Sequence, residues 1–178
     1  MSQAQELQEQ GIKLFQQREY EAAARSFQQA KQAYLEADDE IMAEEMKVNI
    51  ALVHRELGEK QQALDLMQEA LKFFKVKEDQ LRIAQVLGNM GGVYLALQDK
   101  EQAALAYREA ADIFLELGEK QLYADTLLAL GNLQVREGKL VAGVSLYQVG
   151  LEDKTELNMR QRVMKRLSGI VSGFTQGV

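Results

Sequence analysis

The stretch LGNMGGVYLALQDKEQAALAYREA, residues 87–110, contains the spacing that decides the fold. Within it Ala103 is followed four positions later by the bulky Tyr107 and seven positions later by the small Ala110. A further small residue, Gly91, lies twelve positions before Ala103. Small residues at helical offsets allow two helices to pack closely, while the bulky residue fills the space beside them. The stretch therefore predicts a helical hairpin with its turn near Asp99.

The same spacing recurs at a period of 40 residues along the chain. A fixed period of this size predicts stacked helical hairpins instead of one closed core. We expect four hairpins, at about residues 4–38, 39–78, 79–118 and 119–154. Each repeat has the upstream small residue first, followed by the small, bulky and small residues of the pattern. The four sets are Gly11 with Ala23, Phe27 and Ala30; Ala51 with Ala63, Met67 and Ala70; Gly91 with Ala103, Tyr107 and Ala110; and Gly131 with Gly143, Tyr147 and Gly150.

Turn signals fall about every 20 residues and divide each hairpin into two helices of about 16 residues. Gly58, Gly118 and Gly138 suit the left-handed residue that ends a helix. Aspartates that suit helix starts lie at Asp38, Asp39, Asp79 and Asp99. The sequence thus predicts eight helices in four pairs.

A ninth helix is expected at about residues 155–174, after the last repeat. Its apolar stripe consists of Leu157, Met164, Leu167, Val171 and Phe174, and basic side chains occupy the other face. Such a helix would cover the open end of the stack, so we expect one domain over residues 1–178. The same stripe could instead pair across a twofold axis and make a homodimer.

The composition of the chain argues against several classes of function. The chain has no Cys, which excludes disulfides and thiolate chemistry, and its net charge of −6 disfavours nucleic acid as a partner. The first residues lack the pattern of a signal peptide, and no run is long and apolar enough for a membrane span. From this we expect a cytoplasmic protein with no membrane span.

The third repeat resembles the tetratricopeptide repeat, and the resemblance extends over about residues 4–153. Its period of 40 and its lack of Pro are similar to the long-helix subgroup that includes kinesin light chains and bacterial peptide-sensing regulators. The resemblance implies an all-α, right-handed superhelical solenoid of four hairpins with a C-terminal capping helix. The residues that carry it are Leu87, Met90, Gly91, Tyr94, Ala103, Tyr107 and Ala110.

In this family the concave face, formed by the first helix of each hairpin, commonly receives a peptide or a helix of a partner protein. The resemblance therefore implies a partner-binding site on that face. Helical offsets place there Gln8, Ile12, Phe15, Glu45, Val48, Asn49, Leu52, Arg55, Gln85, Asn89, Gly92, Leu95, Asp125, Leu128, Asn132, Val135 and Arg136.

The chemistry of this set is mixed. Apolar side chains supply area, while Asn49, Asn89 and Asn132 offer donors and acceptors that can pair with a peptide backbone. The family's carboxylate clamp is not evident, because Gln8 and Ile12 stand where basic or amide groups are expected. We therefore expect an amphipathic or neutral ligand segment, or a basic one given the acidic body of the chain.

The sequence contains no set of residues that indicates catalysis. His54 is the only histidine and takes a packing position, and no nucleophile with a base is signalled. We expect no cofactor, no metal and no enzyme activity. The favoured function is an interaction scaffold or adaptor, and the alternative is a peptide-sensing or autoinhibited module switched by the C-terminal helix.

Overall fold

The computed structural model describes residues 2–151, which form helices joined by short turns, without a strand in that range. The predictions of an all-α chain and of eight helices are confirmed for these residues, whereas the ninth helix expected at 155–174 lies outside them. The helices are α1 (Gln3–Gln16), α2 (Tyr20–Glu36), α3 (Glu40–Glu56), α4 (Lys60–Val76), α5 (Gln80–Ala96), α6 (Lys100–Glu116), α7 (Lys120–Arg136) and α8 (Leu140–Gly150).

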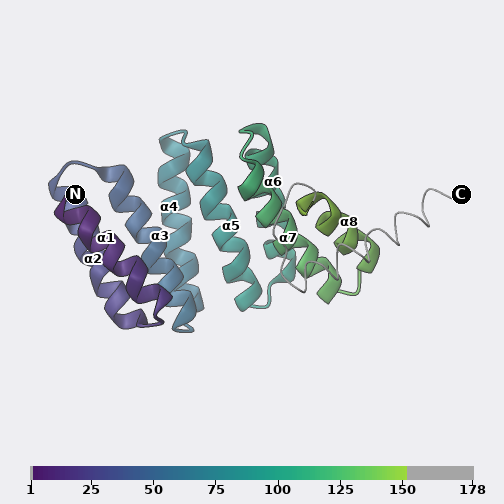
Figure 1. Ribbon diagram of the computed structural model, residues 1–178, viewed down its shortest axis with the longest axis horizontal. Coiled ribbons are helices and arrows are strands. Elements are labelled where there is room, and N and C mark those ends of the chain that lie inside the picture. Colours follow the sequence, from purple (N-terminus) through teal and green to yellow (C-terminus); the bar gives the residue numbers. More distant parts are fainter. Residues whose placement is uncertain (1, 152–178) are drawn as a thin grey trace, which may run out of the picture. The chain divides into compact units, whose positions relative to one another are not determined.

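The chain divides into two compact units. The first ends at Asp99 and contains α1 to α5, in which each helix packs against the next and α3 also meets α5 (Figure 1). The second begins at Lys100, and in it α7 packs against both α6 and α8. The expectation that residues 1–178 form a single domain stays a prediction.

The repeated small and bulky residues lie in the cores of these units. In the first unit Ala23, Ala30, Ala63 and Ala70 are completely buried, and Met67 is buried with them. In the second unit Tyr107 and Tyr147 are buried beside small residues at the same spacing. The pattern in the sequence therefore marks the contacts that hold neighbouring helices together.

Gly11 shows why one of these positions must be small. A methyl group built on its Cα would lie 2.6 Å from the ring atoms Cδ1 and Cε1 of Phe27. Phe27 belongs to α2, so the missing side chain is what allows its ring to approach the backbone of α1 at Gly11. The first hairpin is thereby packed more closely than any residue with a side chain would allow.

All seven turns use one geometry. In each turn the second residue after the helix end has a positive φ, at Arg18, Asp38, Gly58, Glu78, Gln98, Gly118 and Gly138. The next backbone N–H then donates to the carbonyl five residues before it, as Glu59 N does to His54 O at 2.9 Å. This is the bond that closes a helix in the Schellman arrangement. The predicted roles of Gly58, Gly118 and Gly138 are confirmed.

The aspartates divide between two roles. Asp39 and Asp79 cap helices as predicted, because their Oδ1 atoms accept from the backbone N–H of Met42 and Arg82, both at 3.0 Å. Asp38 is a correction, since its φ of 59° makes it the left-handed residue that ends α2. Its short polar side chain tolerates that conformation better than most, which explains why the two roles look alike in sequence.

The turns give a prediction with opposite signs at equivalent positions. Gly58→Ala should lower the free energy of unfolding by about 1–2 kcal/mol, because a methyl group at φ 86° is strained although no atom lies within 4 Å of it. Glu78→Gly should raise it by up to about 1 kcal/mol, since Glu78 already carries that strain. Urea unfolding of both variants measures the two changes, and equal signs would contradict the assignment of these turns.

Candidate functional site

The first helix, α1, carries three of the residues expected on the binding face. Ile12 is 41% exposed, while Gln8 and Phe15 are half-buried. The Oε1 atom of Gln8 accepts a hydrogen bond of 2.6 Å from the hydroxyl of Tyr34 in α2, and Phe15 packs edge-to-face on Tyr20. Burial, followed by the charges of Asp39 and Glu45, raises the pKa of Tyr34, so its hydroxyl stays a donor. Ile12 is therefore the residue of the three that offers open surface.

Glu45 is already paired within the chain. Its Oε1 atom lies 2.5 Å from Nε of Arg82 in α5, and Nη1 of Arg82 lies 2.7 Å from Oδ2 of Asp79. Burial opposes the charge of Arg82, but the two carboxylates outweigh it and raise the pKa of this guanidinium. Arg82 thus bridges α3 and α5. Arg82 was not included in the site expected from the sequence. Its position three residues after the helix cap Asp79 is a signal for the ion pair between the two side chains.

The other expected residues of α3 differ in exposure. Val48 is buried, whereas Asn49, Leu52 and Arg55 are half-exposed. The guanidinium of Arg55 lies 2.7 Å from the neighbouring Glu56. Val48 therefore belongs to the packing between helices, and Asn49 and Leu52 are the members of this group that face outward.

In α5 the expected residues all have accessible surface. Gln85 is exposed, and Asn89, Gly92 and Leu95 are half-exposed. The carboxamides of Gln85 and Asn89 make no hydrogen bond with any residue in the described range 2–151. Gly88 adds to this surface, because a methyl group built on it would have no atom within 4 Å. Gly88 directly precedes Asn89 in the sequence, and this position is the signal that could have placed it in the expected binding site.

Two of the expected residues of α7 face α8 instead. A methyl group built on Gly150 would lie 3.1 Å from Cγ of Leu128, and one built on Gly143 would lie 2.6 Å from Cγ2 of Val135. Leu128 is buried in a cluster with Leu151 and the ring of α8's tyrosine. These two side chains are therefore part of the hairpin core. The glycines of α8 explain why these two side chains are covered. Because the glycines have no side chain, α8 approaches α7 closely enough to contact Leu128 and Val135.

Asn132 is also engaged inside the second unit. Its Nδ2 donates to the carbonyl of Leu128 at 2.9 Å, and its Oδ1 accepts a short hydrogen bond from the hydroxyl of Tyr147. Asp125 and Arg136, at the two ends of the same face, are exposed. The carboxamide of Asn132 thus locks α7 to α8, which leaves it less able to pair with a ligand than Asn89.

Several of the residues that remain open in the first unit lie on α3 and α5. Asn49 and Asn89 occupy equivalent positions 40 residues apart on α3 and α5, two helices that are in contact. We call this surface the α3–α5 strip. It consists of Asn49, Leu52, Gln85, Gly88, Asn89 and Leu95.

His54 has a structural position at the end of α3. Its Nδ1 is in a short contact with Oε2 of Glu59, and its Nε2 lies 3.3 Å from Nε2 of Gln62. The ring therefore ties α3 to the start of α4, as its packing position suggested. Within residues 2–151 there is no group of three His, Asp or Glu side chains that could hold a metal ion.

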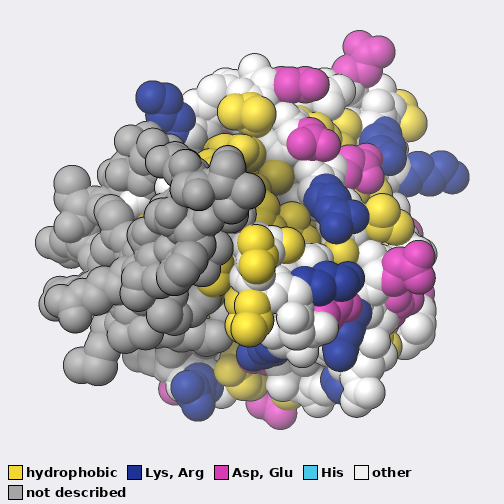
Figure 2. Space-filling view, turned by 90° about the vertical axis from the view of Figure 1, so that its right-hand side faces the viewer, with side chains coloured by type: hydrophobic (Ala, Val, Ile, Leu, Met, Phe, Trp, Pro, Cys, Tyr) yellow, Lys and Arg dark blue, Asp and Glu magenta, His cyan; other side chains and the backbone are white. Residues whose placement is uncertain are grey.

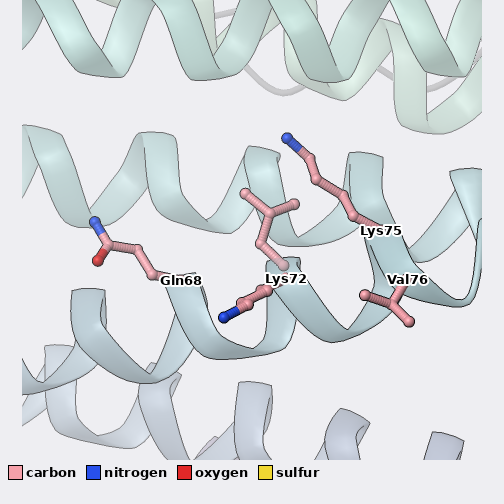
Figure 3. Close-up of a pocket in the computed structure, with 5 residues that line it drawn as sticks. Gln68, Lys72, Lys75 and Val76 are labelled. Atoms are coloured by element: carbon pink, nitrogen blue, oxygen red, sulfur yellow. The ribbon is translucent and has the colours of Figure 1, made fainter.

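The exposed side of α4 has a shallow pocket of about 490 Å³ (Figure 3). Figure 3 shows Gln68, Lys72, Lys75 and Val76 projecting from this helix, and Leu71 completes the lining. All five residues come from one helix, so the pocket is an open surface feature. It contains no convergent set of polar groups of the kind that fixes a small ligand.

Charges are mixed on one face of the molecule. On the face shown in Figure 2, Lys and Arg side chains lie interspersed with Asp and Glu beside a band of hydrophobic side chains. The described part of that face thus has no large area of one sign.

Comparison with known proteins agrees with this architecture. A family model of the tetratricopeptide repeat matches residues 42–116, the range of α3 to α6. Residues 42–116 thus match the tetratricopeptide repeat, and the helical architecture of residues 2–151 agrees with this match. This fold supports a scaffold for protein–protein interaction. A search of curated proteins found no match to the sequence.

Two solved structures have similar folds. The crystal structure of BtubC (BKLC) from P. vanneervenii is 15% identical with a TM-score of 0.74, and the match covers 93% of this chain and 71% of that one. The apo form of RapI is 18% identical with a TM-score of 0.76, covering 97% of this chain and 49% of that one. The chain therefore spans about half the length of RapI. At these identities the likeness concerns the fold.

Among the helices described, none has the length and hydropathy to cross a membrane.

Proposed function

We propose that the protein is a non-catalytic scaffold or adaptor that holds a peptide segment or helix of a partner protein on the first helices of its hairpins. The observation that carries the proposal is the α3–α5 strip. It combines outward carboxamides at Gln85 and Asn89, which have no partner within residues 2–151, with the half-exposed apolar side chains of Leu52 and Leu95.

The chemistry of the strip suits a main-chain ligand. A carboxamide offers both a donor and an acceptor, and so it can pair with the C=O and N–H of an extended segment. Gly88 exposes the backbone of α5 beside Asn89, which allows a ligand to approach closely. Leu52 and Leu95 would take the apolar side of the same segment. Because Arg82 neutralises Glu45, the strip favours a neutral or amphipathic ligand.

Within each unit, the other expected residues that keep accessible surface also belong to the proposal. These include Ile12 on α1 and, on α7, Asp125 and Arg136. The alternative of a regulatory module switched by the C-terminal helix, and a homodimer through that helix, both concern residues outside the described range and stay predictions. The expected cytoplasmic location likewise stays a prediction.

A double substitution tests the strip. Leu52→Glu with Asn89→Ala should reduce capture of partner proteins from native lysate at least about tenfold, because it places a charge in the apolar contact and removes a backbone-pairing group. Pull-down with quantitative mass spectrometry measures the loss. Both side chains are only partly buried, so the variant should keep its helical content and nearly the same melting temperature.

The matched control carries similar changes on α2. Leu35→Glu with Gln28→Ala alters two exposed residues of that helix and should leave capture unchanged. Equal capture by both double variants and the wild type would show that partners bind elsewhere. Loss in the α2 variant alone would contradict the proposed face.

A further inference from the structure

The second unit has a pocket that the proposed binding face does not use. It has a volume of about 410 Å³ and lies between α6 and α8, with α7 as its floor. The floor and the α8 wall supply the apolar side chains Leu127, Leu130 and Leu146, while Arg108 and Asp112 line it from α6. Its volume is within the range of sites that bind small ligands or a few side chains.

The pocket and the proposed face use opposite sides of α7. Consecutive residues of a helix are about 100° apart, so Gln134 and Asn132 project about 160° apart. Tyr123, Leu127, Leu130 and Gln134 follow one another at offsets of four, three and four, and therefore share one side of the helix. Asp125, Asn132 and Arg136 occupy the other side.

Gln134 is the feature of this pocket that points to a ligand. The residue is only 5% exposed, yet its carboxamide makes no hydrogen bond with any side chain or backbone group in the described part of the chain. Its backbone carbonyl, in contrast, closes the turn after α7 by accepting from Lys139 N at 2.9 Å. Neither polar atom of this carboxamide is fully buried, so the amide lines the pocket with its donors and acceptor open to a ligand.

The chemistry around Gln134 restricts what could satisfy it. The carboxamide presents one acceptor and two donor hydrogens, which complement a peptide group and suit neither a pure anion nor a pure cation. Arg108 and Asp112 have opposite charges, so the rim has no net preference for a charged ligand. The leucines on the floor of the pocket favour a ligand that places apolar surface next to the group paired with Gln134.

We propose that this pocket binds an extended, uncharged segment of a partner protein, with an apolar side chain on Leu127, Leu130 and Leu146 and a main-chain amide paired with Gln134. The site is separate from the α3–α5 strip and does not depend on it. A partner could therefore contact the second unit while the proposed face of the first unit is occupied.

The minimal probe is N-acetyl-leucine methylamide, which has one apolar side chain between two peptide groups. Titrated into the full chain and followed by NMR, it should shift the methyl signals of Leu127, Leu130 and Leu146 and the side-chain amide of Gln134, with saturation in the millimolar range. Gln134→Met keeps the length of the side chain and should weaken binding about tenfold, the effect of one hydrogen bond pair. Gln148→Met changes an exposed glutamine of α8 and should leave binding unchanged.

Two further results separate a binding role from a structural one. Gln134→Met should leave the melting temperature nearly unchanged, since the amide bonds to no group in residues 2–151, whereas loss of a structural amide would make it fall. Ala142→Leu fills the pocket from α8 without removing any contact and should abolish the probe's shifts.

Three outcomes would overturn the proposal. The first is the absence of saturable shifts at the pocket, or shifts equal in Gln134→Met and wild type. The second is a change of these signals with protein concentration alone, which would make a second copy the occupant. The third is contact, without probe, between the methyl groups of Leu157 or the ring of Phe174 and the methyl groups of Leu127 or Leu146, which would assign the pocket to the chain's own C-terminal residues.

Discussion

Gly143→Ala is expected to lower the free energy of unfolding of the second unit by about 2 kcal/mol or more. The added methyl group would lie 2.6 Å from Cγ2 of Val135, 2.9 Å from the carbonyl oxygen of Gly131 and 3.0 Å from the backbone N of Val135. Two of these three atoms belong to the backbone of α7, so α8 as a whole would have to move away. The usual gain from replacing a helical glycine, about 1 kcal/mol, is smaller than this cost.

Gly88→Ala is the matched control, because it makes the same change in the middle of α5. No atom lies within 4 Å of the added methyl group, so this variant should be more stable than the wild type by up to about 1 kcal/mol. Urea unfolding followed by circular dichroism compares the two variants. A Gly143→Ala protein as stable as the wild type would contradict the close crossing of α7 and α8.

The second large effect is expected at Lys47. Its ammonium lies 2.8 Å from Oε1 of Glu44 and 3.2 Å from Oε2 of Glu69. Oε1 of Glu44 is buried and accepts no well-aligned hydrogen bond from the described residues, so the nearby ammonium provides its compensation. Lys47→Met would leave that carboxylate buried without a counter-charge, at a cost of about 2 kcal/mol in unfolding free energy.

A double-mutant cycle separates the pair from the packing of its carbon chains. Glu44→Gln combined with Lys47→Met should recover most of the loss, because no buried charge then remains. Glu69→Gln should cost less than about 0.5 kcal/mol, since Glu69 is largely exposed. Additive effects of the two single changes would show that Glu44 and Lys47 do not interact.

The pair also gives a pH dependence with a definite sign. Burial opposes the charge of Lys47, but Glu44 and Glu69 outweigh it and raise its pKa in the folded chain. The stability that this group contributes is therefore fully present below the ordinary lysine pKa, and it is lost as the pH rises through the higher folded value. Lys47→Met should lack this part of the alkaline decline in unfolding free energy.

The sequence predicted the repeat, because its signal is a property of the backbone contact itself. Ala63, Met67 and Ala70 are buried as their spacing required, and Gly11 lies under Phe27. The positions of the turns were likewise predicted correctly from the helix-ending glycines Gly58, Gly118 and Gly138. Left-handed residues such as Arg18 and Glu78 could not be predicted individually, because nothing in their side chains favours that conformation.

The candidate site was predicted less completely, for a reason visible in α7. Helical offsets assign Leu128, Asn132 and Val135 to one broad side of the helix, but they do not tell how far the next helix reaches around it. The glycines of α8 let it approach closely enough that all three side chains turn to it. In α5, where no such covering occurs at Gly88, Asn89 and Leu95 keep the accessible surface that the offsets indicated.

Site-specific photo-crosslinking tests the central claim, which is that the open face of α3 and α5 holds the partner. A photoreactive phenylalanine analogue would be placed singly at Leu52 or Leu95, and at Leu35 on α2 or Leu105 on α6 as exposed controls. After irradiation in native lysate, covalent adducts with other proteins should form from Leu52 and Leu95 and be nearly absent from the two control positions. Adducts confined to Leu35 or Leu105 would contradict the account.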